Sequence, residues 1–229
     1  MIIKGLQKTT LLDFPGRVAC TIFTGGCNFR CPFCHNASLV LQPAKVSTID
    51  EDEFFSFLKK RTGILDGVCI TGGEPLLQPD IIPFIKKIRE LGFSVKLDTN
   101  GSRFDLLKQL IDEGLVDYVA MDIKNSPQKY AESIGLDEAV EDIFKSIKYL
   151  MSCGIDYEFR TTVVRELHTK EDLTAAAQYI KGAKKYYLQA FKDSGDLISQ
   201  GFSAYSEEEM RDLLKCVAPY VSTSDLRGV

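Results

Sequence analysis

The sequence predicts an α/β fold, a partial, open (β/α)6 barrel with parallel strands, on three observations. Short apolar runs rich in Val, Ile, Tyr and Phe alternate with segments of helical periodicity along the 229-residue chain. The runs are almost continuously apolar, which is typical of parallel strands covered on both faces. A closed barrel of eight units usually needs about 250 residues, so six units suit this length better. A doubly wound sheet is the alternative architecture.

The six apolar runs are the predicted strands, in chain order 18–23, 67–71, 93–98, 116–121, 157–164 and 185–191. Helical spacing of apolar residues predicts helices over 50–61, 79–91, 103–113, 136–151, 170–180 and 206–217. In parallel α/β sheets, ligands bind at the carboxyl ends of the strands. The segments with chemical character occupy that position, in order TGGCNFRCPFCHN, TGGEP, DTNG, DIKN, RTTVV and QAFK.

Composition and charge narrow the class of protein. The length suits one domain, 1–229, with a core over about 17–191 and a C-terminal extension over 192–229. A net charge of −4 and scattered Lys and Arg give no basic patch for nucleic acid or an anionic membrane. No apolar run approaches a membrane span, and seven cysteines are a poor disulfide framework. We therefore expect a cytoplasmic protein in a reducing compartment, with a protein or a small molecule as its partner.

Three cysteines, Cys27, Cys31 and Cys34, stand within the segment CNFRCPFC. An iron–sulfur cube needs four ligands, so three local thiolates require a distant fourth cysteine or an external ligand. The alternative is structural zinc completed by His35 or a distant cysteine, although zinc ligands usually come as two spaced pairs. The remaining cysteines are expected to pack as small apolar residues. They are Cys20, Cys69, Cys153 and Cys216.

Three further features can each be explained by local structure alone, without a ligand. The segment 72–75, GGEP, lies between a strand and a helix, where glycines allow close approach of a ligand and free amides bind a carboxylate; it is equally a tight turn. The segment 98–101, DTNG, has good turn chemistry. His168 has no identifiable partner and is expected on the surface at the start of a helix.

Together, CxxxCxxC over 27–34 and GGEP about forty residues later resemble the radical S-adenosylmethionine superfamily. The resemblance implies that Cys27, Cys31 and Cys34 bind three irons of one [4Fe-4S] cluster, while the amino and carboxylate groups of S-adenosylmethionine chelate the fourth. An electron from the cluster then cleaves the sulfonium to give a 5′-deoxyadenosyl radical, which abstracts hydrogen from the substrate. No catalytic residue beyond the cluster and the cofactor is expected, because the cofactor carries the chemistry.

The segments GLQKTTLLDFPGRVACTIFTGGCNFRCPFCHN, LDTNG and MDIK resemble glycyl-radical-enzyme activases. The opening segment is most similar to activating proteins of anaerobic ribonucleoside-triphosphate reductase, with pyruvate formate-lyase activating enzymes a close second. This implies an anaerobic reaction with a glycyl radical enzyme and an electron donor such as flavodoxin or ferredoxin. A single cluster is expected, because 36–70 contains only Cys69. A small-molecule substrate and a non-catalytic zinc module remain the alternatives.

The resemblance also implies roles for single residues in binding the cofactor. The residues expected beside the adenine are Phe33, Cys34, His35, Gln189 and Phe191. Those expected to receive the methionyl amino group are Gly72, Gly73 and Glu74.

The remaining implied roles concern the other groups of the cofactor. The residues expected around a monovalent cation near the cofactor carboxylate are Asp98, Thr99 and Asp122, and Asp98 and Asn100 are also expected to contact the cofactor. Lys124 is expected at the carboxylate or the ribose, and Arg160 and Thr162, which share a strand face, at the sulfonium-bearing half.

Overall fold

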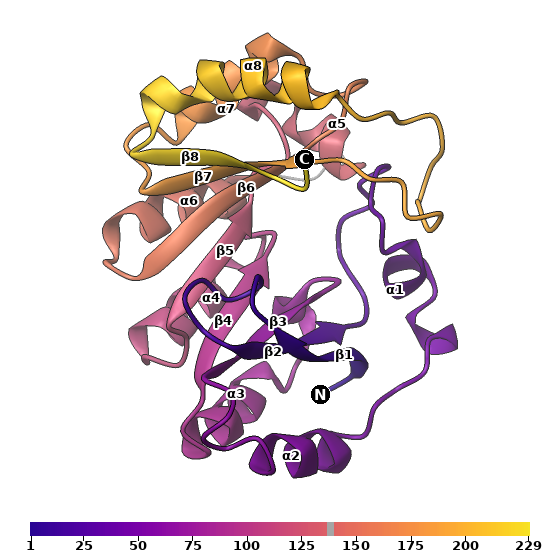
Figure 1. Ribbon diagram of the computed structural model, residues 1–229, viewed down its shortest axis with the longest axis vertical. Helices are drawn as coiled ribbons and strands as arrows, with labels where there is room; N and C mark the ends of the chain where they lie inside the picture. The colour runs from indigo at the N-terminus through magenta and orange to yellow at the C-terminus, as the bar shows by residue number, and fades with distance from the viewer. Residues whose placement is uncertain (137–139) are drawn as a thin grey trace. The chain divides into compact units, whose positions relative to one another are not determined.

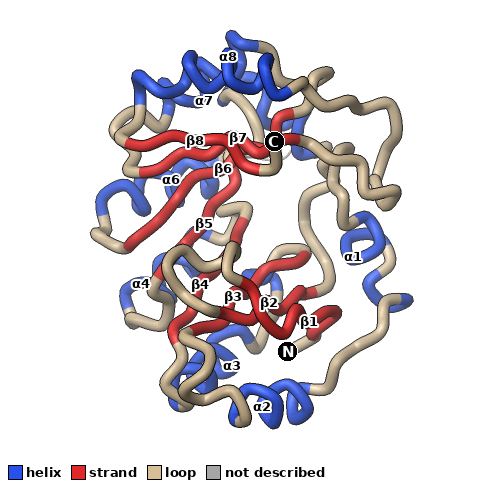
Figure 2. Tube along the Cα trace, in the orientation of Figure 1, coloured by secondary structure: helices blue, strands red, loops and turns tan. Residues whose placement is uncertain are grey.

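The structure is a computed structural model that describes residues 1–136 and 140–229. The described residues form eight strands, which neighbour one another in chain order and, from β2 onward, alternate with helices along the trace (Figure 2). The strands are β1 (Ile3–Thr10), β2 (Ala19–Thr24), β3 (Gly67–Gly72), β4 (Ser94–Thr99), β5 (Tyr118–Asp122), β6 (Asp156–Val163), β7 (Lys185–Ala190) and β8 (Thr223–Arg227). The helices are α1 (Ala37–Leu41), α2 (Glu51–Lys59), α3 (Ile81–Glu90), α4 (Phe104–Asp112), α5 (Tyr130–Ile134), α6 (Glu141–Ser152), α7 (Lys170–Tyr179) and α8 (Glu207–Val217).

The chain divides into two compact units, which we describe separately. The first comprises 1–28, 38–99 and 103–119, and the second 29–37, 100–102 and 120–229. In the first unit β1 pairs antiparallel with β2, whereas β2, β3 and β4 are parallel. The register aligns Ile22, Ile70 and Leu97, all fully buried. The core of this unit is therefore built on the parallel strands that the apolar runs predicted.

Helices α2 and α3 close the core of the first unit with aromatic rings. Phe54 stacks on Phe84 with ring centroids 5.5 Å apart, and Phe55 contacts both rings. Helix α2 begins after Asp50, whose side chain accepts from the amides of Asp52 and Glu53 and so caps the helix. The cap marks where α2 starts, and the face of the helix that carries Phe54 and Leu58 is buried.

In the second unit β6, β7 and β8 are parallel, and the register aligns Thr162, Gln189 and Arg227. Helices α7 and α8 pack against each other, and α8 lies along β7 and β8 (Figure 1). Capping boxes start both helices, at Thr169 for α7 and at Ser206 for α8. All six predicted helices exist within a few residues of the expected bounds. The predicted helix 136–151 is found as α6 from Glu141, Leu136 is not helical, and residues 137–139 of the predicted range lie outside the described part of the chain.

The prediction of six strands was wrong by two edge strands, β1 and β8. An edge strand buries few side chains: β8 has none in the buried class, and β1 buries only its first and last residues. Without an apolar run, periodicity gives no signal. Instead, β8 is held by a bidentate ion pair of Arg227 with the buried Glu158, at 2.6 and 2.8 Å, and the Arg227 guanidinium lies 3.8 Å from the ring centroid of Tyr187.

His168 was expected on the surface, and this expectation is wrong: the residue is fully buried in the second unit. Its Nδ1 accepts from the amide of Val164 at 3.0 Å, so Nε2 carries the proton and donates to the carbonyl of Lys124 at 2.7 Å. The ring also meets Phe33 edge-on, with centroids 6.0 Å apart. Burial lowers the pKa of His168 by more than these backbone partners raise it.

In the described parts of the chain, 1–136 and 140–229, no helix combines the length and the apolar character needed to cross a bilayer. Of the four dispersed cysteines, Cys20 is fully buried and fits the predicted packing role. Cys69 is fully buried as well, but its Sγ lies 3.7 Å from Lys96 Nζ and from Asp98 Oδ1, so its thiol packs against polar groups. Burial raises the pKa of Cys20 to about 12. Cys153 and Cys216 are only partly buried.

The buried neutral His168 predicts a stability that falls with acid. The unfolded chain protonates this imidazole near its ordinary pKa of about 6.5, and the folded chain does so only at lower pH. Between these values the unfolded state binds more protons. The free energy of unfolding should therefore fall by up to about 1.4 kcal/mol per pH unit as pH decreases below about 6.5. Urea unfolding at pH 5.5, 6.5 and 7.5 measures the slope.

The substitution His168→Gln should remove this component of the slope, whereas His35→Gln should leave it in place and remove only the separate component that comes from the lowered pKa of His35. An identical pH slope in the wild-type protein and in His168→Gln would contradict the assignment.

Cysteine burial predicts a graded reaction with an alkylating agent. In the native protein at pH 8, iodoacetamide should modify the partly exposed Cys153 and Cys216 before Cys20 and Cys69, which should react at least about a hundredfold more slowly, because only an accessible thiolate reacts. Mass spectrometry of timed samples gives the order. Rapid labelling of Cys20 before unfolding would show that β2 opens in the native state.

Candidate functional site

The cysteine segment follows β2, and its last part belongs to the second unit. Within that unit the amide of Cys34 donates to the carbonyl of Cys31 at 2.9 Å, which turns the chain between the two thiols. The amide of Arg30 donates to the carbonyl of Ile134 at 2.8 Å. Gly135, with φ +67°, passes so close to Arg30 that a Cβ there would lie 2.4 Å from the Arg30 carbonyl oxygen. Only glycine permits this approach.

The segment 194–199 braces the cysteine loop, although no motif in the sequence pointed to it. The amides of Ser199 and Ile198 donate to the carbonyls of Pro32 and Cys34 at 2.8 and 3.3 Å. The hydroxyl of Ser194 donates to the carbonyl of His35 at 3.1 Å. Backbone donors of almost any residue can make such contacts, so the sequence carries no signal for them.

Phe33, expected beside the adenine, is buried and meets Phe202 as well as His168 edge-on. Its ring is therefore part of the core of the second unit. Its neighbour His35, also expected beside the adenine, is exposed, and Cys34 is partly exposed. A contact of this segment with an adenine remains a prediction, and the packing of Phe33 favours backbone groups for it.

Cys31 is almost fully buried, and burial raises the pKa of its thiol to about 11 despite the opposing charge of Lys124. A metal ligand must be a thiolate. Lys124 supplies the positive charge that favours the thiolate of Cys31. The thiols of Cys31 and Cys34 in turn help to raise the pKa of Lys124. This donor set fits iron of an iron–sulfur cluster, because the ligands are soft sulfur atoms, Cys31 is shielded from water and a cation lies nearby to balance charge.

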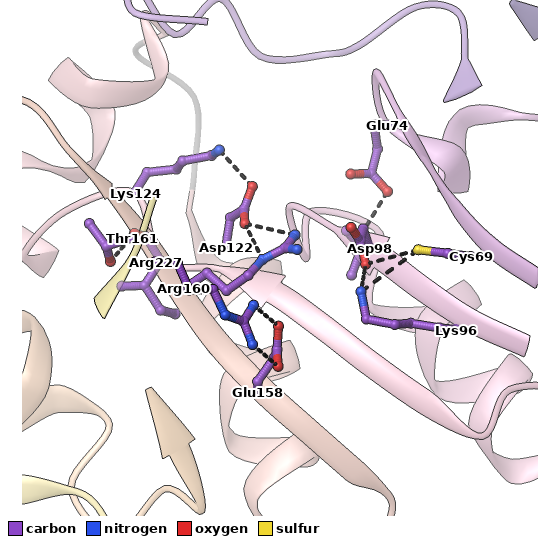
Figure 3. A network of polar contacts seen from close by, with 12 residues as sticks. Cys69, Glu74, Lys96, Asp98, Asp122, Lys124, Glu158, Arg160, Thr161 and Arg227 are labelled. Carbon is purple, nitrogen blue, oxygen red and sulfur yellow. Dashed lines mark hydrogen bonds and ion pairs between the residues drawn. The ribbon is translucent and has the colours of Figure 1, made fainter. Parts of the chain in front are cut away.

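Asp122, at the end of β5, lies between two cations (Figure 3). Its carboxylate is 2.8 Å from Lys124 Nζ and 3.1 Å from Arg160 Nη2. Burial raises the pKa of Asp122, but Lys124 and Arg160 outweigh it and lower the pKa to about 2. All three side chains remain partly exposed, between 13 and 28%. The second unit therefore presents a carboxylate held ionised by two cations, one of which also faces the cysteine loop.

The GGEP segment lies in the first unit, fixed against the backbone that leads into Cys27. The amide of Gly73 donates to the carbonyl of Thr24 at 2.9 Å, and that of Glu74 to the carbonyl of Gly26 at 2.8 Å. A Cβ on Gly73 would lie 1.9 Å from the Gly26 oxygen. The expectation of free amides at these two residues is therefore wrong, because the fold uses them. The segment can instead offer acceptor oxygens to an amino group.

The carboxylate of Glu74 is buried, and its Oε1 accepts from Thr99 Oγ1 at 2.7 Å and from the amide of Leu76 at 3.1 Å. Glu74 and Thr99, predicted for the amino group and for the cation, are thus direct partners. Asp98, the residue before Thr99, forms an ion pair with Lys96, which the sequence analysis missed (Figure 3).

Other predicted residues lie on strand ends of the second unit. Arg160 and Thr162 share one face of β6, and Thr162 is in register with Gln189 of β7. Thr161 points to the opposite face, where its hydroxyl contacts the Ile123 carbonyl at 2.6 Å and the Tyr186 hydroxyl at 2.7 Å. Phe191, just after β7, is buried. Asn100 is buried and accepts from the amide of Ser102 at 2.9 Å, which makes a local turn.

No three His, Cys, Asp or Glu side chains are grouped as a single metal ion requires, within residues 1–136 and 140–229. A cube binds its cysteines on different irons and does not need them to converge on one point. The monovalent-cation site remains a prediction whose residues fall in both units: Asp98 and Thr99 in the first, Asp122 in the second.

Comparison with known proteins identifies the family. The sequence profile of the radical SAM superfamily matches residues 21–180. A Methanocaldococcus jannaschii protein assigned as a glycyl-radical enzyme activating enzyme is 33% identical over 238 residues, covering 100% of this chain and 96% of the relative. The pyruvate formate-lyase-activating enzyme of Clostridium pasteurianum is 28% identical over 189 residues, covering 80% of this chain and 77% of that enzyme.

A solved structure agrees with these matches. SuiB of Streptococcus suis, bound to S-adenosylmethionine, gives a TM-score of 0.69 at 16% identity, over 90% of this chain and 49% of that one. This likeness confirms the predicted α/β fold with a mostly parallel sheet. The superfamily implies a [4Fe-4S] cluster and S-adenosylmethionine, in agreement with the thiols of the cysteine segment. By the match over 21–180 and the full-length relative, the chain belongs to the radical SAM superfamily of enzymes.

Proposed function

We propose that this chain is a glycyl-radical-enzyme activase, and that its partner is an enzyme of the anaerobic ribonucleoside-triphosphate reductase class. The observation that carries the proposal is the full-length correspondence with a relative assigned to this activity. The sequence supports the reductase as partner, because the segment 5–36 resembles activating proteins of that class more than those of the formate-lyase class.

With the cluster and S-adenosylmethionine bound, one electron from a flavodoxin or ferredoxin would allow reductive cleavage of a carbon–sulfur bond of the cofactor, with methionine as the leaving group and a hydrogen atom of the partner's glycine ending on the 5′ carbon of the product 5′-deoxyadenosine. Cys27, Cys31 and Cys34 would hold three of the irons. Lys124 favours the thiolate of Cys31 through its positive charge, because an opposite charge nearby stabilises the ionised form.

Two groups of this chain suit the two polar ends of an amino acid. The carboxylate of Glu74 and the carbonyls of Gly72 and Gly73 are acceptors, as a protonated amino group requires. Lys124 and Arg160 are cations at strand ends, as a carboxylate requires. The amides of Gly73 and Glu74 are already hydrogen-bonded to the backbone and keep the acceptors in place, which reduces the entropy lost when the cofactor binds.

The first prediction tests the activity directly. Anaerobically reconstituted protein, reduced and supplied with S-adenosylmethionine and an anaerobic ribonucleotide reductase, should produce a protein-based doublet in electron paramagnetic resonance, with 5′-deoxyadenosine formed in equal amount. Cys34→Ala should abolish both signals, whereas Cys153→Ala, outside the cysteine segment, should keep them.

A doublet formed only with a formate-lyase type enzyme would reassign the partner. Formation of 5′-deoxyadenosine with a small-molecule substrate and no glycyl radical on any candidate enzyme would refute the activase proposal.

The second prediction concerns the backbone contact of Gly73. A methyl group in Gly73→Ala would meet the Gly26 oxygen at 1.9 Å, so the acceptor segment must move away from the backbone before Cys27. We expect the dissociation constant for S-adenosylmethionine to rise at least about tenfold, equal to about 1.4 kcal/mol of binding free energy. Equilibrium dialysis with cluster-loaded protein measures it.

Gly5→Ala is the matched control, because its added methyl would meet only the Phe23 side chain, at 3.2 Å. Equal affinities for Gly73→Ala and the wild-type protein would show that this segment does not contribute to cofactor binding.

A further inference from the structure

Lys96 is a charged residue to which neither the fold nor the proposed reaction has assigned a role. It lies on β4, in the first unit, with only 2% of its side chain exposed. Its Nζ forms an ion pair with Asp98 Oδ1, and Cys69 Sγ lies 3.7 Å from both atoms (Figure 3). The three polar groups form one buried cluster, which we call the Lys96 cluster.

The geometry of the strand explains why the ion pair forms. Residues two apart on a strand point to the same face, so Lys96 and Asp98 are neighbours on β4. A buried ammonium is costly unless it is paired, and Asp98 supplies the pair. The ring of Tyr118, with its centroid 6.0 Å from Nζ, adds an attractive face for the cation. The charge of Lys96 is thus built into the core of this unit.

Asp98 is also the residue that the family resemblance assigns to a monovalent cation. A metal ion on this carboxylate would lie beside the Lys96 ammonium, and like charges at such range repel. Lysine has no acceptor atom with which to ligate a metal. Asp122, the second carboxylate assigned to that cation, is paired with Lys124 and Arg160 in its own unit. Both carboxylates therefore already have a cation supplied by the chain, and they do not fit an added metal ion.

We propose that the Lys96 ammonium takes the place of the monovalent cation, so that this chain binds S-adenosylmethionine without Na⁺ or K⁺. The inference rests on the proposed use of that cofactor. Lysine suits the role because its ammonium is a compact unit charge with three donors on a flexible stem.

The wild-type protein provides the first test. Cluster-loaded protein is dialysed against S-adenosylmethionine in KCl, NaCl or choline chloride of equal ionic strength, since choline is too bulky to replace a small metal ion. The dissociation constants should agree within about twofold. Binding about tenfold tighter in K⁺ or Na⁺ than in choline would overturn the proposal.

The variant Lys96→Met provides the second test, because methionine fills similar space without charge. Its affinity in choline should fall about tenfold and recover when K⁺ or NH₄⁺ is added, since the site then accepts an external cation. Lys108→Met, at a half-exposed lysine paired with Asp112 on α4, is the matched control and should show no salt dependence. A loss of affinity that no monovalent cation repairs would contradict the replacement role.

Thermal unfolding of the cluster-free protein separates this inference from the proposed function. The midpoint of the wild-type protein should be the same within about 1 °C in the three salts, whereas K⁺ should raise that of Lys96→Met, because a ligand of the native state stabilises it. Stabilisation of the wild-type protein by K⁺ over choline would overturn the inference even if no S-adenosylmethionine binds. If Lys96→Met does not fold, the two wild-type comparisons decide.

Discussion

A carboxylate at the partly buried end of a strand is neutralised by neighbouring cations, and this constraint applies in both units. In the second unit Asp122 is balanced by Lys124 and Arg160, and in the first Asp98 by Lys96. Each pair forms because alternate residues of a strand share a face, or because adjacent strands bring their ends together. A carboxylate without its cation would be protonated or would destabilise the core.

The pairing at Asp122 also connects chemistry to packing. The ammonium of Lys124 forms an ion pair with Asp122, and its positive charge favours the thiolate of Cys31. The backbone carbonyl of Lys124 accepts a hydrogen bond from the buried His168. His168 in turn packs on Phe33, which lies between two of the cysteines in the sequence. One strand end therefore determines the charge near the Cys31 thiol and supports the loop that carries it.

Backbone contacts provide the second level of organisation. Glycine is required where two segments come closer than a side chain allows, at Gly73 against Gly26 and at Gly135 against Arg30. The first contact holds GGEP against the backbone before Cys27, in the first unit, and the second holds Gly135 against the backbone before Cys31, in the second unit. The amides that make these contacts are no longer available to a ligand, so the binding groups left to the GGEP segment are acceptors, which agrees with an amino group rather than a carboxylate as its ligand.

The family likeness extends over the fold and the cysteine segment. The match to the radical SAM profile over 21–180 spans the cysteine triplet and GGEP, and SuiB has a similar fold. The Lys96 cluster is a feature that the family resemblance did not imply. Such a residue shows why a role carried over from relatives, here cation binding by Asp98, has to be examined against the neighbours that this chain places around it.

For the part of the chain that the structure describes, the sequence by itself determined the α/β class, six of the eight strands and all six long helices, because buried elements repeat apolar residues at periods that a single chain displays. It also located the cysteine segment and GGEP, since these motifs are contiguous. It did not reveal β1 and β8, which bury little, or the segment 194–199, which acts through its backbone. Only the tertiary structure decided that His168 is buried, that the amides of Gly73 and Glu74 are engaged, and that Asp98 and Asp122 have lysine partners. Each of these depends on which side chains and carbonyls come into contact in the folded chain, and a local sequence pattern does not predict such contacts.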